Sequence, residues 1–209
     1  ALRDKAVKAS VGGGDWSAER VRTAIRETIA RVAILRRTPL TLDAGRHRTL
    51  LDARAMADLL ELLAWGGFSA RAWASSQSPL ARLADGDARL DPRVSLVGDL
   101  EGAGVPLCQA DGYARPARLD LIRTGVLAGR LVSPRSAREF SLPGNGAAGD
   151  ETPQALSLSA GTLAQGDALA APGTGVWVSN FWYLNFSDRH TCRVTGMTRA
   201  ALAPQDSGG

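Results

Sequence analysis

Hydrophobic residues recur every three or four positions after Ser17, which is the spacing that places them on one face of a helix. Ser17 is a residue type that caps helix N-termini, and Glu19 would lie in the first turn, where the helix dipole favours a negative charge. Pro39 marks the end of the pattern, because proline cannot continue a helix. We therefore predict a helix whose apolar face consists of Val21, Ile25, Ile29 and Val32.

A second helix is predicted after Asp52, which can cap it, through Leu63. The pair Gly66-Gly67 stops this helix, because glycine has more conformational freedom than any other residue. Between the two helices, residues 40–51 have a pattern that suits a strand interrupted at Gly45.

The rest of the chain changes to short apolar runs separated by turn-forming residues, which is typical of strands. Arg123-Thr124-Gly125, between two of these runs, is predicted to be a hairpin turn. Residues 142–153 contain too many glycine and proline residues for regular structure and are predicted to be the most flexible segment. The predicted strands are residues 94–97, 119–122, 126–132, 155–158 and a long one from residue 176.

Helices early in the chain and strands later predict an α+β fold, with early helices packed on a mostly antiparallel, strand-rich domain. Alternating βαβ units are not indicated. The 209 residues are 44% hydrophobic and 22% charged, which is ordinary for a globular protein. A chain of this length can bury a core without metal or disulfide bonds.

The charge pattern does not indicate a nucleic-acid partner. The formal net charge is only +4, and the arginines, which are 23 of the 25 basic residues, are spread along the whole chain. A nucleic-acid-binding protein more often concentrates its basic residues in one stripe with interleaved aromatics. The densest group, Arg31, Arg36 and Arg37, closes the first predicted helix, where cations favour the negative end of the dipole.

Cysteine content and hydropathy indicate the compartment. Cys108 and Cys192 are too few for a disulfide framework, and no apolar run approaches the ~20 residues that span a bilayer. The start of the chain has no pattern of a secretory signal. The sequence therefore predicts a cytoplasmic protein without a membrane partner.

The block from Gly173 to Arg199 combines aromatic, amide and charged side chains in an alternating, strand-like pattern. A cleft for extended peptide needs this mixture, because main-chain pairing provides affinity and aromatic pockets hold alternate side chains. Alternatively, Phe181, Trp182 and Phe186 are core, and Asn185 and Asp188 bind the backbone of a turn at a strand end. The candidate peptide-binding residues are Asn180, Trp182, Tyr183, Asn185, Ser187, Asp188 and Arg193.

The same block resembles the C-terminal region of the TldD/PmbA family, whose members are often described as modulators of DNA gyrase. The similarity is carried by WYLNFSDR at residues 182–189 and CRVTGMTR at residues 192–199. Further similar words occur in the family's order, so that the resemblance covers most of the chain. They are WGGFSAR at 65–71, QSPL at 77–80, QADGYARP at 109–116 and SPRSA at 133–137.

The resemblance implies three segments. Residues 1–16 would be the remnant of an N-terminal domain with its linker, and Asp4–Lys8 would be the last strand of that domain. Residues 17–38 would be a connecting helix. Residues 39–209 would form a C-terminal domain that is incomplete at its C-terminal end.

Active members of the family are metallopeptidases whose zinc is bound by an HExxxH helix and a later cysteine. The corresponding helix here, Asp52–Leu63, contains no histidine. Asp58 and Glu61 lie three residues apart on it, but carboxylates without imidazole make a poor zinc site, and a solvated helix face is the better interpretation. The resemblance therefore implies a PmbA-type subunit with no catalytic residue and no metal of its own.

Such a subunit would pair with a TldD-type subunit that carries zinc, or form a homodimer, and the assembly would trim unfolded or extended peptides. Two alternatives remain open. One is a non-enzymatic protein that binds peptide or acts as a scaffold. The other is a divergent hydrolase that uses His190 and Cys192, whose spacing would direct both side chains to one side of a strand. A nucleophilic thiol needs a lowered pKa, so Cys192 is interpreted as a small buried side chain.

Overall fold

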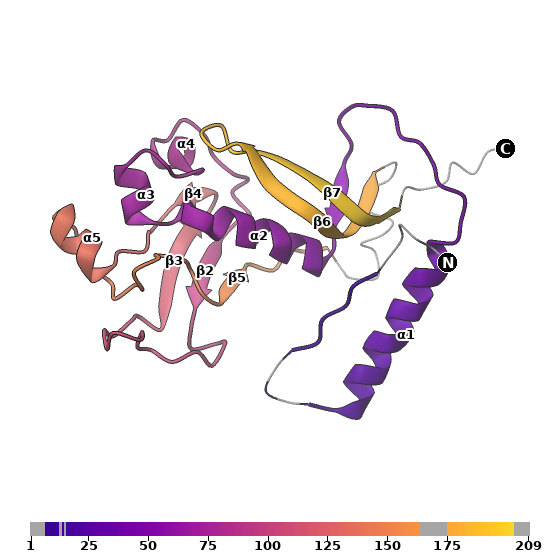
Figure 1. Ribbon diagram of the computed structural model, residues 1–209, viewed down its shortest axis with the longest axis horizontal. Helices are drawn as coiled ribbons and strands as arrows, with labels where there is room; N and C mark the ends of the chain where they lie inside the picture. The colour runs from indigo at the N-terminus through magenta and orange to yellow at the C-terminus, as the bar shows by residue number, and fades with distance from the viewer. Residues whose placement is uncertain (1–6, 13, 15, 164–174, 203–209) are drawn as a thin grey trace. The chain divides into compact units, whose positions relative to one another are not determined.

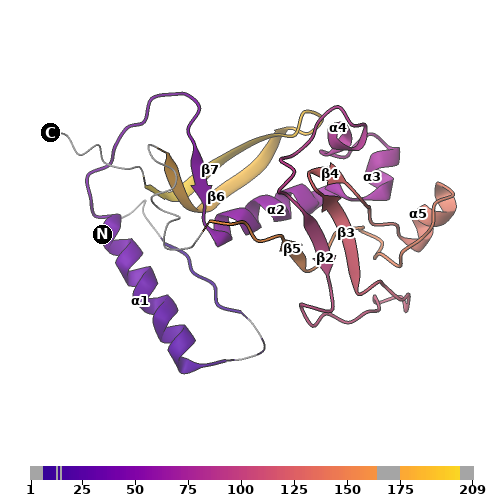
Figure 2. The ribbon, with the colours of Figure 1, turned by 180° about the vertical axis from the view of Figure 1, so that it is seen from behind.

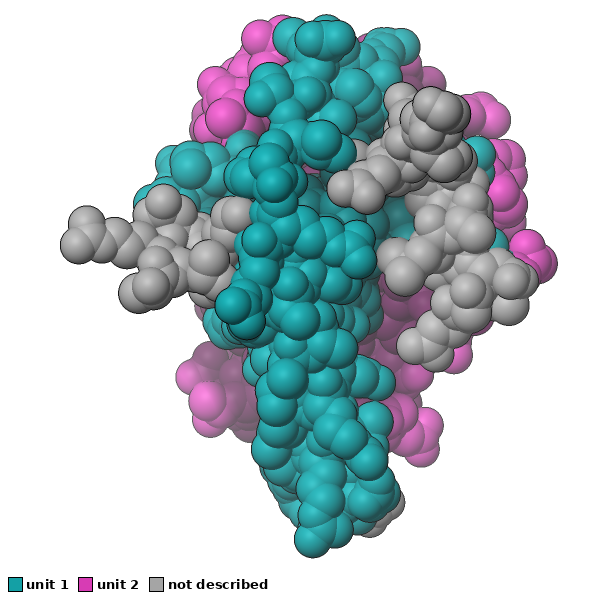
Figure 3. Space-filling model, turned by 90° about the vertical axis from the view of Figure 1, so that its right-hand side faces the viewer, with its two compact units in different colours: residues 1–59, 163–184, 196–209 teal, residues 60–162, 185–195 magenta. Residues whose placement is uncertain are grey.

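The computed structural model describes residues 7–12, 14, 16–163 and 175–202. The chain divides into two compact units (Figure 3). Unit 1 comprises residues 1–59, 163–184 and 196–209, and unit 2 comprises residues 60–162 and 185–195. Most of the predicted strand Asp4–Lys8 lies outside the described residues, as do Gly173 and the last seven residues.

A three-stranded sheet with the order β1-β6-β7 forms the centre of unit 1. β1 (Thr49–Leu51) is parallel to the start of β6 (Val176–Asp188), and β7 (Arg193–Leu202) follows β6 as the second arm of a hairpin (Figure 1). The strand predicted over residues 40–51 is thus limited to its last three residues. The small core of this unit consists of buried Ala55, Val176 and Val178 with partly buried Leu51 and Phe181.

The first helix, α1 (Ala18–Ile34), begins as predicted. The Ser17 hydroxyl accepts a hydrogen bond from the Arg20 backbone N–H at 3.2 Å. The helix ends at Ile34, several residues before Pro39, and the chain continues in turns. None of its residues is buried, so the predicted apolar face of α1 is not covered within the described residues.

The second helix, α2 (Ala53–Gly67), also follows its predicted cap. Asp52 Oδ1 accepts a hydrogen bond from the Ala53 N–H at 2.8 Å. The helical conformation breaks at Trp65 and at Gly66, where φ is +78°. Because this left-handed conformation suits glycine, the glycine pair stops the helix as the sequence predicted.

Unit 2 is built on a four-stranded antiparallel sheet with the order β4-β3-β2-β5 (Figure 2). Its strands are β2 (Leu96–Asp99), β3 (Arg118–Arg123), β4 (Val126–Leu127) and β5 (Leu156–Leu158). Each overlaps a predicted run, although β2 begins two residues later than predicted and β4 is only two residues long. The fold class is α+β, and the strand pairing is mostly antiparallel, as predicted.

Three short helices and the end of α2 complete unit 2. They are α3 (Ala70–Ala74), α4 (Ala81–Ala84) and α5 (Pro134–Glu139). No helix in the described part of the chain has the length and apolar content required to cross a membrane. The buried core of the unit consists of Phe68, Leu80, Leu83, Leu96, Leu121 and Ile122.

Candidate functional site

The helix that would carry the zinc motif, α2, has its carboxylates in unsuitable surroundings. Asp58 forms an ion pair with Arg54 at 2.8 Å, and its Oδ2 accepts a hydrogen bond from the Phe181 N–H at 3.2 Å. The Asp58 side chain is only 15% exposed, so the expectation of a solvated face is wrong at this position. Glu61 is exposed, as expected.

The residues of α2 do not fit a zinc ion. The helix has no imidazole, and the one partly buried carboxylate, that of Asp58, already binds a guanidinium and a backbone N–H. Over the described ranges, no three His, Cys, Asp or Glu side chains are grouped so that they could hold a metal ion. Asp58 instead links the start of α2 to the middle of β6.

Asn180, the first of the candidate peptide-binding residues, is buried, with 1% of its surface exposed. Its Oδ1 lies 3.0 Å from the Ser179 hydroxyl, which is also 3.1 Å from the Ala200 carbonyl of β7. These contacts connect the two arms of the hairpin. Asn180 is therefore buried within unit 1, where its side chain contacts its sequence neighbours Ser179 and Phe181.

Trp182 and Tyr183 are exposed on the same strand, with 60% and 52% of their surface accessible. The alternative interpretation of Trp182 as a core residue is thus not supported. Because consecutive residues of a strand point to opposite faces, the two rings lie on different faces of β6. One peptide on one face of the sheet would meet only one of them.

The remaining candidates lie near the turn of the hairpin, in unit 2. The Asp188 carboxylate accepts hydrogen bonds from the His190 and Thr191 N–H groups. Its pKa is lowered, first by hydrogen bonding to the Thr191 side chain and then by these N–H groups. Ser187 donates to the Arg193 carbonyl at 3.3 Å, and Asn185 Oδ1 accepts from the Phe186 N–H at 2.8 Å. Asn185, Ser187 and Asp188 therefore each form a hydrogen bond with nearby backbone, which for Asn185 and Asp188 agrees with the alternative interpretation.

His190 and Cys192 lie in this turn, so the expected strand geometry that would direct both side chains to one side is wrong. Cys192 has φ of +53°, packs against the core of unit 2, and has its thiol pKa raised by burial. His190 is exposed. A raised pKa leaves the thiol protonated, which disfavours a nucleophilic role.

Arg189, which sequence reasoning did not single out, anchors the hairpin turn within unit 2. It donates hydrogen bonds to the carbonyls of Trp65 and Gln77. Its guanidinium also lies 4.8 Å from the centre of the Trp65 ring and 5.3 Å from that of Phe186. A cation at the last carbonyls of a helix is favourable, so Arg189 closes the end of α2. The sequence signal was its place in the family word at 182–189.

Glu151 is a second residue that the sequence did not reveal. Its carboxylate is 1% exposed and accepts hydrogen bonds from the Ser69 hydroxyl at 2.6 Å and from the N–H groups of Arg71 and Ser133, both at 2.9 Å. Ser69 and Ser133 cap α3 and α5. The loop 142–153 is irregular as predicted, but Glu151 ties it to both helices, which does not support the predicted flexibility.

A comparison with models of protein families identifies one family. Residues 44–205 match the family described as the PmbA/TldA metallopeptidase C-terminal domain. No curated protein sequence gives a significant match.

Three solved structures are similar in fold. A candidate modulator of a DNA gyrase from Thermotoga maritima is 22% identical with a TM-score of 0.64, and the match covers 81% of this chain and 39% of that one. A second candidate modulator of DNA gyrase, from Bacteroides thetaiotaomicron, is 14% identical with a TM-score of 0.58, covering 85% and 42%. TldE from Thermococcus kodakarensis is 11% identical with a TM-score of 0.61, covering 88% and 47%. The chain thus spans less than half the length of each, and these identities show the fold alone.

Proposed function

Because this chain belongs to the PmbA/TldA metallopeptidase family, we propose that it is part of a subunit that has no zinc of its own and assists a zinc-bearing, TldD-type subunit. In this proposal the assembly works in the cytoplasm and trims unfolded or extended peptides. The chain contributes structure and peptide contacts, while the partner supplies the zinc-bound water that attacks the peptide bond.

One observation supports the proposal above all others. The helix that matches the family's zinc helix, α2, has no histidine, and its Asp58 side chain is held by Arg54 and the Phe181 N–H. Freeing Asp58 for a metal would leave Arg54 without its ion pair and a backbone N–H without its acceptor. Both losses cost free energy, which supports the proposal that this helix does not bind the metal.

The test is to mix the full-length protein with a TldD-type partner and to follow cleavage of an unstructured peptide. We expect metal-dependent peptidase activity from the mixture and none from either protein alone. Elemental analysis of the separate proteins should find zinc in the partner only.

A partner whose HExxxH glutamate is replaced by glutamine is the matched control, because it keeps the assembly but removes the general base. The control mixture should be inactive. If the partner cleaves peptide at the same rate with and without this protein, or if this protein alone carries stoichiometric zinc, the proposal is wrong.

A second candidate function is peptide binding without a proteolytic assembly, and the hairpin supports it. β7 is the outer strand of the three-stranded sheet in the described part of unit 1, so its free edge offers backbone groups to an extended chain. Trp182 on the neighbouring strand is 60% exposed and supplies a large ring on one face of the same sheet.

Isothermal titration of unstructured peptides in the presence of a chelator tests this candidate. Binding should persist without metal, and Trp182→Ala should weaken it about tenfold because exposed aromatic anchors dominate such contacts. Trp16→Ala is the control, since Trp16 is similarly exposed, at 67%, but precedes α1. Equal affinities for the wild type and Trp182→Ala would exclude this role for the hairpin.

A further inference from the structure

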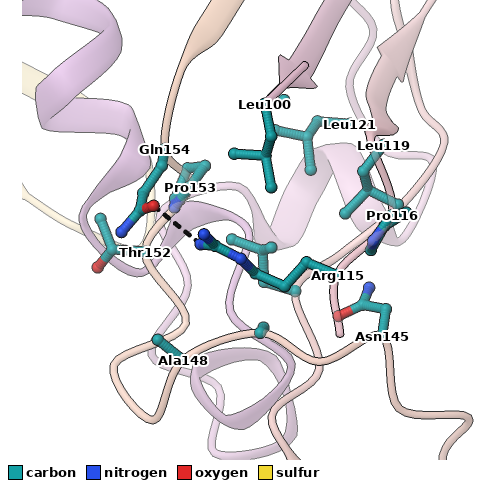
Figure 4. Close-up of a pocket in the computed structure, with 13 residues that line it drawn as sticks. Leu100, Arg115, Pro116, Leu119, Leu121, Asn145, Ala148, Thr152, Pro153 and Gln154 are labelled. Atoms are coloured by element: carbon teal, nitrogen blue, oxygen red, sulfur yellow. Dashed lines mark hydrogen bonds between the residues drawn. The ribbon is translucent and has the colours of Figure 1, made fainter. Parts of the chain in front are cut away.

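A small cavity in unit 2 has one polar end and one apolar end (Figure 4). Its volume is about 40 Å³. On this measure one water molecule needs only about 10 to 15 Å³, so the cavity has room for the end of a ligand, such as a carboxylate with its adjoining carbons. Its main lining side chains are Leu100, Leu119 and Leu121 at the apolar end, and Arg115, Thr152 and Gln154 at the polar end.

Arg115 brings a positive charge into this cavity without a negative partner. Its Nη1 donates to Gln154 Oε1 at 2.8 Å, and its Nη2 lies 2.6 Å from the Pro106 carbonyl and 3.1 Å from the Cys108 carbonyl. All three acceptors are neutral. None of the ion pairs between described residues includes Arg115.

Some N–H groups of the Arg115 guanidinium also have no hydrogen-bond acceptor. Its Nε is buried and has no hydrogen-bond partner in the described structure, and Nη1 uses only one of its two hydrogens. An unpaired donor of a charged group is costly to bury, and the cost is removed when an acceptor arrives. Arg115 is therefore prepared for an additional, preferably anionic, acceptor.

No carboxylate in the described part of the chain forms an ion pair with Arg115. Most of those that lie next to the cavity wall in sequence have other contacts: Asp99 and Asp120 accept hydrogen bonds from other residues. Glu151 binds the N-terminal ends of α3 and α5, and Asp150 accepts a hydrogen bond from the Thr152 N–H at 3.3 Å. Since Arg115 has no carboxylate partner in the described chain, the anion of this proposal is supplied by another molecule.

Some of the other polar groups around the cavity already form hydrogen bonds within the protein, and some do not. Asn145 is used, because its Oδ1 accepts from the Val132 N–H and its Nδ2 donates to the Arg130 carbonyl. The Thr152 hydroxyl and the Gln154 amide nitrogen form no hydrogen bond with any other described residue. They lie on the side of the cavity toward which Arg115 extends (Figure 4). Arg115 and these two exposed residues thus lie at one end of the cavity, opposite three leucines.

We propose that this cavity binds a carboxylate carried on a short aliphatic group, with Arg115 as the charge partner and Thr152 and Gln154 as additional donors. The leucines contact the aliphatic carbons. The ligand is either a free small acid or the C-terminal residue of a peptide, which present the same chemistry. The site lies within unit 2 and does not depend on zinc or on the proposed partner.

Matched acids and amides test the proposal on the full-length protein. N-acetylalanine and its amide have nearly the same size and differ in charge, as do trialanine and trialanine amide. We expect each acid that fits to bind at least about tenfold more tightly than its amide, because hydrogen bonds between charged groups are the stronger ones. Binding should also shift the methyl NMR signals of Leu119 and Leu121.

Two variants separate binding from folding. Arg115→Gln removes the charge, and Ala148→Met fills the cavity while it retains Arg115; both should weaken acid binding about tenfold or more. Arg118→Gln is the control, because Arg118 is an exposed arginine at the start of β3. Thermal unfolding of each variant verifies that it is folded.

The pattern of results assigns the ligand or removes the site. Binding of N-acetylalanine alone indicates a free small acid, and binding of trialanine as well indicates peptide C-termini. Equal affinity for acids and amides, no measurable binding of either acid, or unchanged binding by both folded cavity variants overturns the proposal.

Discussion

The buried carboxylate of Glu151 illustrates how one residue can organise a loop. Burial by itself would raise its pKa, but hydrogen bonds from the Ser136 and Ser69 hydroxyls and from the N–H groups of Arg71 and Ser133 outweigh it and hold the pKa at about 2. No cation contacts this carboxylate among the described ion pairs, so N–H and O–H donors at two helix starts stabilise its charge.

Replacement of Glu151 by glutamine should therefore destabilise the protein. The amide keeps the shape but offers one acceptor oxygen where two are needed, and its NH₂ faces groups that are themselves donors. We expect a loss of about 2 to 3 kcal/mol in the free energy of unfolding, measured by urea denaturation at pH 7. Glu139→Gln on the exposed side of α5 is the control and should change stability by less than about 0.5 kcal/mol.

The same variant gives a pH profile with a definite sign. Glu151 has a folded-state pKa of about 2 against an ordinary value of 4.5, so its contribution is present above pH 4.5 and is lost as the pH falls toward 2. At full size the contribution is about 3 kcal/mol. The stability difference between wild type and Glu151→Gln should hence shrink over this range. A difference that stays constant down to pH 2.5 would contradict the role assigned to the carboxylate.

The β3–β4 hairpin shows how much an element can follow from local sequence. Thr124 and Gly125 have φ of +47° and +80°, which is the two-residue turn that fits the twist of paired strands. The sequence predicted this turn from its residue types. The sequence could not predict that the backbone at Leu90 and Asp91 lies against Gly125, because these residues are more than 30 positions apart along the chain.

Two glycines with nearly the same φ separate the cost of backbone strain from the cost of the close backbone contact. A Cβ at Gly125 would collide with the carbonyl oxygens of Leu90 and Asp91, whereas a Cβ at Gly86, with φ of +81°, would have nothing within 4 Å. Gly86→Ala should cost about 1 kcal/mol from backbone strain alone. Gly125→Ala should cost about 3 kcal/mol, because packed backbone must also move.

Thermal or urea unfolding of the two glycine variants provides the measurement. Equal destabilisation would show that the segment at Leu90 and Asp91 moves away at little cost. The larger loss at Gly125 would show that this close approach is a fixed part of unit 2.

At the scale of the whole molecule, the family assignment and the departure from the family motif have to be considered together. Residues 44–205 belong to a metallopeptidase family, yet α2 has no histidine, and its Asp58 is engaged with Arg54 and with the Phe181 N–H. The chain spans less than half of its solved relatives. The proposed activity of the whole protein therefore has to be tested by the reconstitution experiment with a partner.

The sequence by itself determined the features that depend on neighbouring residues. Ser17 caps α1, Gly66 ends α2 and Thr124-Gly125 turns a hairpin, because each effect acts within a few residues. The α+β class and the family also followed from patterns that can be read along the chain. The missing imidazole of α2 was visible in the same way.

Only the tertiary structure decided what the polar side chains do. It placed Asn180 in the interior and Trp182 at the surface of one strand, and it brought Glu151 to two helix starts from which it is about 20 and 80 residues distant. It also left Arg115 without a carboxylate beside a small cavity. Burial and long-range hydrogen bonding depend on which segments meet, and no local pattern of residue types contains that information.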